Sequence, residues 1–181
     1  MEKVRKPAVA GSFYPGAADK LASIVRGYLS AAEKWPQAGR SKAFIVPHAG
    51  YIYSGSVAAN VYAALAERRD EIQRVVLFGP SHRVPLRGLA VPTSDAFDTP
   101  LGRVPLDRGA IEAATALPQV CVADAAHEYE HSLEVQLPFL QGVLTDFHLV
   151  PFSVGDATAE EVAEVMDLLW GDAETLLLVS S

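Results

Sequence analysis

Two short apolar runs of the chain end in the same way, in a turn that carries a histidine. Residues 45–51 read IVPHAGY and residues 77–82 read LFGPSH. Each run is typical of a buried strand, and the proline and glycine that follow end it. Ligands of open α/β sheets bind at the carboxyl ends of the strands. Two imidazoles delivered there can meet on one metal ion, so His48 and His82 are candidate metal ligands.

The order of elements along the chain predicts an α/β fold. Strand-like runs alternate with segments in which apolar residues recur at helical spacing. We predict strands at 42–46, 73–78, 89–91, 148–154 and 175–179, and helices at 17–33, 54–69, 107–117, 131–144 and 159–170. Pro138 should kink or divide its helix, and residues 93–105, dense in proline, glycine and aspartate, should be a loop. This alternation favours a mostly parallel or mixed central sheet flanked by helices.

The length and the end of the chain bound its domain organisation. The 181 residues suffice for one core, and no repeat or linker divides them, so we expect a single domain over residues 1–181. The apolar strand at 176–179 is followed by only two residues, whereas a βα domain ordinarily continues through a loop into a helix. We therefore expect the C-terminal part of the domain to be missing.

Composition and charge narrow the classes of partner. The net charge is −7 and the pI is about 5.2, which argues against nucleic acid, because neutralising phosphates needs many Lys and Arg residues. No apolar run approaches the roughly 20 residues that span a bilayer. The basic N-terminus lacks the apolar region of a signal peptide. The single cysteine, Cys121, cannot form an internal disulfide. We expect a cytoplasmic protein without nucleic-acid or membrane partners.

A third polar segment, residues 127–131, reads HEYEH. It contains the zincin signature, in which His127 and His131 would bind zinc with Glu128 as general base, and it also fits the inverted version. The residues that follow offer no obvious further ligand. A solvated turn before the next helix is the structural alternative. The favoured interpretation sets Glu130 and His131 beside the His48 and His82 site, as groups that transfer protons or orient the metal ligands.

Five segments together resemble one family across nearly the whole chain. They are residues 8–15, 47–55, 79–82, 98–102 and 130–138. In combination they are similar to the Memo family, named for a mediator of cell motility in animals, whose prokaryotic members are often called AmmeMemoRadiSam system protein B. The resemblance implies a fold similar to the class III extradiol dioxygenases. Those enzymes hold non-haem Fe(II) with two histidines and a third protein ligand.

The resemblance also implies roles for individual residues. His48 and His82 match the two metal-ligand histidines of the family, and Glu130 and His131 match its active-site Glu-His-Ser segment, which makes them candidate catalytic residues. Family members supply a third ligand, a cysteine in the animal protein, later than residue 181; Cys121 lies in a different region. Fe(II) is the expected metal, Cu is the alternative, and Zn is less favoured.

Three tyrosines complete the predicted site. Tyr14, Tyr51 and Tyr53 could line the pocket and stack on a planar substrate, although core packing is an equal alternative for each. We predict that they bind substrate.

Three functions follow from these residues, in order of preference. The first is a metal-dependent redox protein with a dioxygenase-like site and an unknown substrate, for which turnover is left open. The second is a non-catalytic binding module that uses the same cleft for a peptide or small molecule, as implied by the adaptor role of animal Memo toward a phosphotyrosine segment. Arg83 and Arg87 are too few for a phosphate clamp. The third is a zincin-like hydrolase. The prokaryotic family name implies two partners, a radical S-adenosylmethionine enzyme and an AMMECR-type protein.

Overall fold

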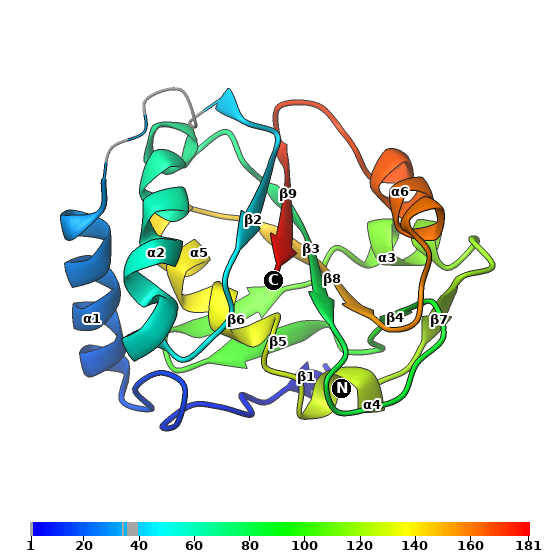
Figure 1. Cartoon of the computed structure of the whole chain (residues 1–181), viewed down its shortest axis with the longest axis horizontal. Helices are drawn as coiled ribbons and strands as arrows, with labels where there is room; N and C mark the ends of the chain where they lie inside the picture. Colours follow the sequence, from blue (N-terminus) through cyan, green and yellow to red (C-terminus); the bar gives the residue numbers. More distant parts are fainter. Residues whose placement is uncertain (1, 34, 36–39) are drawn as a thin grey trace.

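A six-stranded sheet forms the centre of the molecule (Figure 1). The computed structural model describes residues 2–33, 35 and 40–181. Across the sheet the strand order is β2 (Ala43–Val46), β9 (Thr175–Ser180), β3 (Arg74–Pro80), β8 (His148–Val154), β4 (Leu89–Val91) and β7 (Val120–Val122). Neighbouring strands are parallel except β4, which runs antiparallel to β8. The predicted α/β fold with a mixed central sheet is confirmed.

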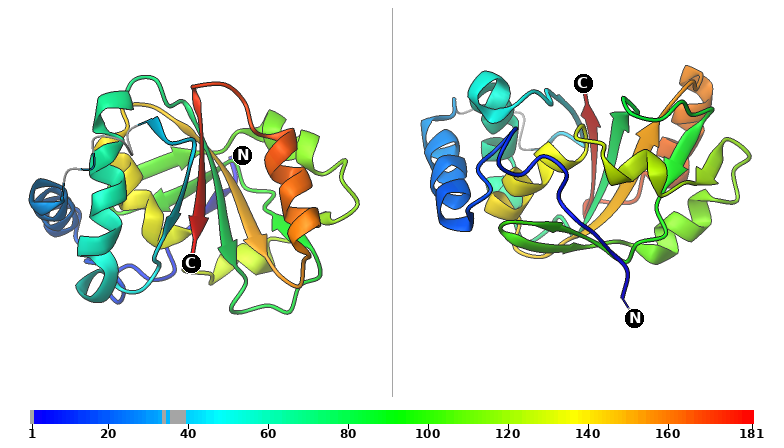
Figure 2. Two further views of the ribbon diagram at one scale, coloured as in Figure 1. Left: turned by 45° about the horizontal axis from the view of Figure 1, so that its top comes forward. Right: turned by 90° about the horizontal axis from the view of Figure 1, so that it is seen from below.

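Helices flank the sheet on both sides (Figures 1 and 2). One side carries α1 (Ala18–Ala31), α2 (Tyr51–Ala64) and α5 (Leu137–Val143), and the other carries α3 (Arg108–Ala114) and α6 (Ala159–Leu168). The central strands β3, β8 and β9 are almost continuously apolar and buried, as expected for strands covered on both faces. No helix in the described part of the chain has both the length and the apolar character needed to cross a membrane.

The prediction of a loop at 93–105 is wrong in part. The segment contains β5 (Ala96–Thr99) and β6 (Gly102–Pro105), an antiparallel hairpin that joins β1 (Val4–Arg5) in a second, three-stranded sheet. Gly102, with φ of +123°, permits the tight turn between the strands. The two strands are only four residues long and are bounded by turn-forming residues, so the sequence pattern did not indicate them. The pairing of β5 with β1 spans some 90 residues, which local pattern cannot reveal.

Other differences from the prediction are small or have a tertiary cause. Pro138 divides the helix predicted at 131–144, as expected, into η3 (Glu134–Gln136) and α5, where the proline lies in the first turn and its missing N–H costs nothing. Helix α2 begins at Tyr51, earlier than predicted, because its first N–H donates to the Phe13 carbonyl at 2.8 Å. The helix predicted at 54–69 ends at Ala64 and is followed by the short helix η2 (Ala66–Arg68), whereas strand β7 and helix α4 (Ala125–Glu128) were not predicted.

A buried ion pair joins the N-terminal strand to the polar segment 130–136. The Glu134 side chain is fully buried and accepts hydrogen bonds from the Arg5 guanidinium, from the Tyr14 hydroxyl at 2.5 Å and from two backbone N–H groups of the N-terminal segment. Arg5 also donates to the carbonyls of Glu130 at 2.7 Å and His127 at 3.0 Å. Because both charges are fully hydrogen-bonded, removing either one would leave the other buried without a partner.

The Glu134→Gln variant tests this ion pair. The amide keeps the shape but not the charge, so we expect the free energy of unfolding to fall by about 3–5 kcal/mol, measured by chemical denaturation. Glu2→Gln is the matched control, because Glu2 pairs with Arg103 at the surface, where an ion pair contributes at most about 1 kcal/mol. Similar losses in the two variants would contradict a stabilising role for the buried pair.

Candidate metal centre

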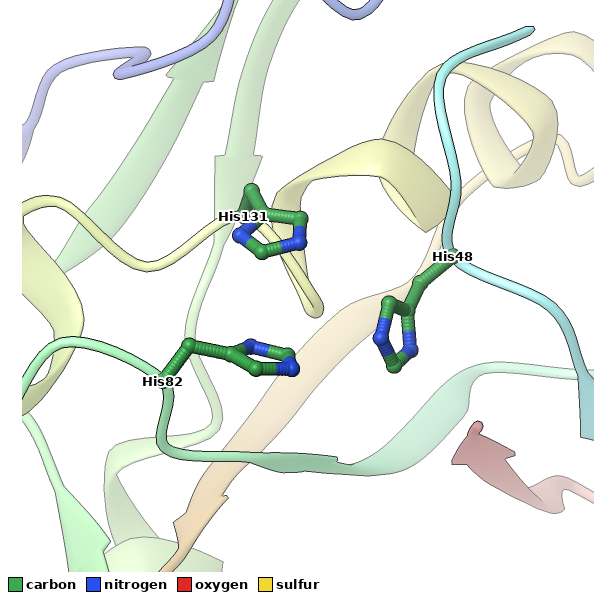
Figure 3. A group of neighbouring side chains, drawn as sticks. All are labelled: His48, His82 and His131. Atoms are coloured by element: carbon green, nitrogen blue, oxygen red, sulfur yellow. The ribbon is translucent and has the colours of Figure 1, made fainter. Parts of the chain in front are cut away.

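Three histidines lie together at the carboxyl end of the main sheet (Figure 3). His48 follows β2, His82 follows β3, and His131 lies just before η3. One nitrogen from each ring lies within 4.8 Å of the others. The ring centroids are 4.7 Å apart for His82 and His131, 5.2 Å for His48 and His82, and 5.6 Å for His48 and His131. In Figure 3 the three rings turn toward a common space. They form the one group of potential metal ligands found among the described residues.

The loop that carries His48 is fixed by contacts on both sides. The Ser54 hydroxyl donates to the Ala49 carbonyl at 3.0 Å, within the turn that leads into α2. Tyr51, at the start of that helix, donates its backbone N–H to Phe13 and its hydroxyl to the Val135 carbonyl at 2.7 Å. The hydroxyl contact connects the His48 loop to the segment that carries His131. The two histidines are therefore held by one connected set of hydrogen bonds.

The turn that carries His82 approaches the His131 segment closely. A Cβ atom added at Gly79 would lie 2.7 Å from the Ser132 hydroxyl and 2.8 Å from a methyl group of Leu133, and both of these residues are buried. The Ser132 hydroxyl also donates to the Pro80 carbonyl at 3.0 Å. Glycine is thus needed at position 79 to let the end of β3 reach the His131 segment.

The buried Glu130 carboxylate holds the turn that carries His82. One oxygen accepts from the His82 backbone N–H at 2.6 Å, and the other accepts from His82 Nδ1 at 2.9 Å. The second oxygen also accepts from the N–H groups of His131 and Ser132, both at 2.8 Å. Burial raises the pKa of Glu130, but these hydrogen bonds outweigh it and lower the pKa from 4.5 to about 2. Glu130 is therefore a charged acceptor at neutral pH.

Ser180 and Gln136 orient His48. The Ser180 hydroxyl donates to the Ser132 carbonyl at 2.6 Å and accepts from the Gln136 side-chain amide at 2.8 Å. Because that hydroxyl has given its hydrogen to Ser132, the contact of 3.3 Å with His48 Nδ1 is a hydrogen bond donated by the imidazole. A proton on Nδ1 leaves Nε2 unprotonated, and an unprotonated nitrogen is the form that binds a metal.

The electrostatic surroundings keep two of the histidines neutral. Burial lowers the pKa of His48 below 6.5, and the neighbouring His82 lowers it further. Burial also lowers the pKa of His131, with a smaller opposing effect from the Glu130 charge. Neutral imidazoles can donate a lone pair to a metal ion, whereas imidazolium cannot. His48 and His131 therefore present metal-binding forms at neutral pH.

The predicted substrate-binding tyrosines do not lie together on the surface. Tyr14 and Tyr51 are 3% and 4% exposed, and their hydroxyl groups donate to Glu134 and to the Val135 carbonyl. These positions match the core-packing alternative. Tyr53 is 78% exposed. Substrate binding by these three residues stays a prediction.

His127 lies apart from the three-histidine cluster. It belongs to α4, which ends at Glu128, so His127 and His131 do not share a helix. The His127 ring is buried against Phe97, and its Nε2 donates to the Ala90 carbonyl at 3.0 Å. The zincin interpretation needs both histidines on one helical face, and this arrangement gives it no support.

Arg87, one of the two arginines that follow His82, is held by contacts within the chain. Arg87 makes a bidentate pair with Glu161, at 2.7 and 2.8 Å, and donates to the Asp156 carbonyl. Its guanidinium is thus already occupied by a carboxylate of this chain. The geometry gives no specific support to a phosphopeptide reader at this position.

Comparison with known proteins shows the family of the chain. The family model described as Memo-like protein matches residues 5–181. The chain belongs to the Memo family. A MEMO1 family protein of Archaeoglobus fulgidus is 40% identical over 178 residues, which cover 95% of this chain and 62% of that protein. Memo relatives of Aquifex aeolicus and Thermotoga petrophila are each 37% identical and cover 99% and 98% of this chain. The chain spans 66% and 68% of their lengths.

Three contributions to this Memo site were not recognised from the sequence. His131 was assigned to proton transfer, and the structure brings it into the cluster as a third potential ligand. Gln136 and Ser180 were not considered, although both hydrogen-bond around His48. The available sequence signal for Gln136 is its place in segment 130–136, which is rich in polar residues. Nothing local points to Ser180, because its role depends on β9 pairing with β2.

Alanine substitution of each clustered histidine tests the metal centre. We expect His48→Ala, His82→Ala and His131→Ala each to lower metal affinity at least tenfold, because each removes one of three ligands. Calorimetric titration with Zn²⁺ or Co²⁺ measures the affinities. His148→Ala is the control, an exposed histidine at the start of β8. Unchanged affinity in the His131→Ala variant would return His131 to the role of a proton-transfer group.

His127 gives a prediction for pH-dependent stability. Burial lowers its pKa from 6.5 to about 4. As the pH falls from 6.5 to 4, the unfolded chain takes up a proton at His127 that the folded protein does not. The free energy of unfolding that His127 contributes above pH 6.5 therefore falls by about 3 kcal/mol over this range. In His127→Gln this contribution is absent, and the free energy of unfolding should fall less steeply over that range. Parallel pH profiles of wild type and variant would refute the assignment.

Proposed function

We propose that this Memo-family chain is a metal-dependent redox protein with a dioxygenase-like site, with Fe(II) as the favoured metal. One observation carries the proposal: His48, His82 and His131 offer three nitrogens within 4.8 Å of one another at the carboxyl end of the sheet. That end is where α/β sheets bind ligands. Three protein ligands leave coordination positions open, which is the arrangement of non-haem iron oxygenases. Copper is the second candidate, because imidazole also suits it.

The donor set fits a metal ion. Three nitrogens bound to one ion at about 2.1 Å and at right angles to one another are about 3.0 Å apart, so metal binding would draw the three nitrogens together from their separations of up to 4.8 Å. Glu130 and Ser180 hydrogen-bond the remote nitrogens of His82 and His48, a feature that orients metal ligands. When bound, Fe(II) would supply the redox chemistry and the open positions for O₂ and substrate.

His131 can serve as a ligand or as a proton donor, but one nitrogen cannot do both at once. A nitrogen that binds the metal has no proton to transfer. The ligand role is favoured because the ring nitrogen lies with those of His48 and His82. Glu130 then acts as a positioning residue, since its oxygens are occupied by His82 and by backbone N–H groups. Proton transfer by His131, with Glu130 adjusting it, is the competing assignment.

The second candidate function is a binding module that uses the same end of the sheet without turnover. Ile45, Ile52 and Tyr53 flank His48 in the sequence, and each is more than 70% exposed. Exposed apolar side chains of this kind are typical of contact surfaces. Such a module would recognise a peptide or a small molecule. The proposed partners, a radical S-adenosylmethionine enzyme and an AMMECR-type protein, are candidates for that surface.

Metal-dependent O₂ consumption separates these functions. The chain is loaded anaerobically with Fe(II), Cu or Zn, the bound metal is quantified, and O₂ uptake is followed with ascorbate as the electron donor. We expect Fe(II)-loaded protein to consume O₂ faster than the same concentration of Fe(II) in buffer, and His82→Ala to abolish the difference. The His148→Ala control should behave as wild type. Stoichiometric metal without O₂ uptake would favour the binding module.

A further inference from the structure

We propose that an apolar pocket beside His48 holds the non-polar part of the substrate, so that this Memo protein acts on a small molecule with a metal-binding head and an apolar body. The inference rests on the proposed function. The pocket has a volume of about 360 Å³. It lies where α6 faces the carboxyl ends of three strands, and Phe78 of β3, Val154 of β8, Val179 of β9 and the helix residues Val162 and Met166 form its apolar walls.

The polar and apolar groups of the pocket are segregated. His48 and Ser180 line it, and both belong to the hydrogen-bonded cluster described above. The wall side chains from β3, β8 and α6 are apolar, and no Asp, Glu, Lys or Arg side chain lines the described pocket. Val162, Met166, Val154 and Val179 are only half-buried. An apolar ligand would remove these side chains from water, and this burial of apolar surface would favour binding.

The size of the pocket limits the ligand. A volume of about 360 Å³ is at the lower end of the range for small-molecule sites. This suits a body of about one ring or a short alkyl chain rather than a polymer or a folded peptide. Since His48 lines both the pocket and the cluster, a ligand whose body fills the pocket would have its head at the metal position. The head group would therefore be an oxygen or nitrogen donor.

Two larger cavities do not offer this combination. The larger of the two, of about 620 Å³, is lined by charged side chains that include Arg40, Lys42 and Glu67 and by none of the three clustered histidines. A pocket of about 450 Å³ between the N-terminal segment and α4 is lined by Lys3, Arg5 and Asp124, whose charges are already paired within the chain. None of the three clustered histidines lines it. The pocket beside His48 is thus the better candidate for a substrate.

A series of n-alkyl hydroxamic acids, from two to eight carbons, probes both parts of the site. The head binds metal ions and the tail tests the pocket. We expect affinity for the metal-loaded protein, measured by calorimetry, to rise about three- to fourfold per methylene until the pocket is full. Met166→Trp should fill the pocket and flatten the series, and Val162→Asn should weaken the long members without blocking the short ones. Leu168→Trp is the control, an exposed position on the same helix outside the pocket.

A methyl signal reports the tail independently of the metal. The chain has only two methionines, so methyl-labelled Met166 can be assigned by comparison with Met166→Leu. A shift of this signal by the eight-carbon but not the two-carbon ligand supports the pocket. If the protein binds no metal, the proposed function fails, while the Met166 shift still tests the pocket. If metal and the two-carbon ligand bind but neither the signal nor the affinity depends on tail length, the pocket proposal is overturned.

The greater length of the relatives provides one more test. A segment of a longer Memo chain could cover the same apolar walls. The series is therefore repeated on the full-length Archaeoglobus fulgidus protein. Tail-length dependence in both proteins supports a substrate pocket. Dependence in this chain alone would overturn it in favour of an internal contact.

Discussion

The buried Glu130 carboxylate is the contact on which the arrangement of the histidines depends. It accepts hydrogen bonds from the His82 backbone, the His82 ring and the N–H groups of His131 and Ser132. A buried carboxylate is stable only when its charge is compensated in this way. Because the donors come from two turns more than 40 residues apart, the carboxylate sets the distance between them. A metal site needs such prior order, since its ligands must already lie close together.

Glu130 and Glu134, two acidic residues of one segment, bind different parts of the chain. Glu130 points to the turn that carries His82, whereas Glu134, one helical turn later, binds Arg5 and the N-terminal segment. Both are buried and charged acceptors of hydrogen bonds from elsewhere in the chain. Motif resemblance alone suggests chemistry for every polar residue of this segment. The contacts instead divide it into residues that position ligands, residues that hold the fold, and one histidine, His131, that enters the cluster.

The sequence was sufficient for five of the six strands of the main sheet, but not for β7 or for the full site. Strands β4 and β8 were predicted with their observed bounds, because buried strands of a sheet covered on both faces are mostly apolar. His48 and His82 were found because each follows such a strand. The small sheet and the role of Ser180 were missed because both depend on pairing between distant segments. His131 was found, but its approach to the other two rings requires the contact at Gly79, which is a three-dimensional fact.

The position of strand β9 explains why the turns after β2 and β3 must bring His48 and His82 toward each other. Strand β9 lies between β2 and β3, so the strands that lead to His48 and His82 are not neighbours. Two strand spacings separate them, which is about 9.6 Å. The turns after the strands must therefore bring the two rings toward each other, and the ring centroids end only 5.2 Å apart. Ser180 at the end of β9 fills the gap between the strands and hydrogen-bonds His48. The middle strand thus separates the two ligand-bearing strands and also orients one of the ligands.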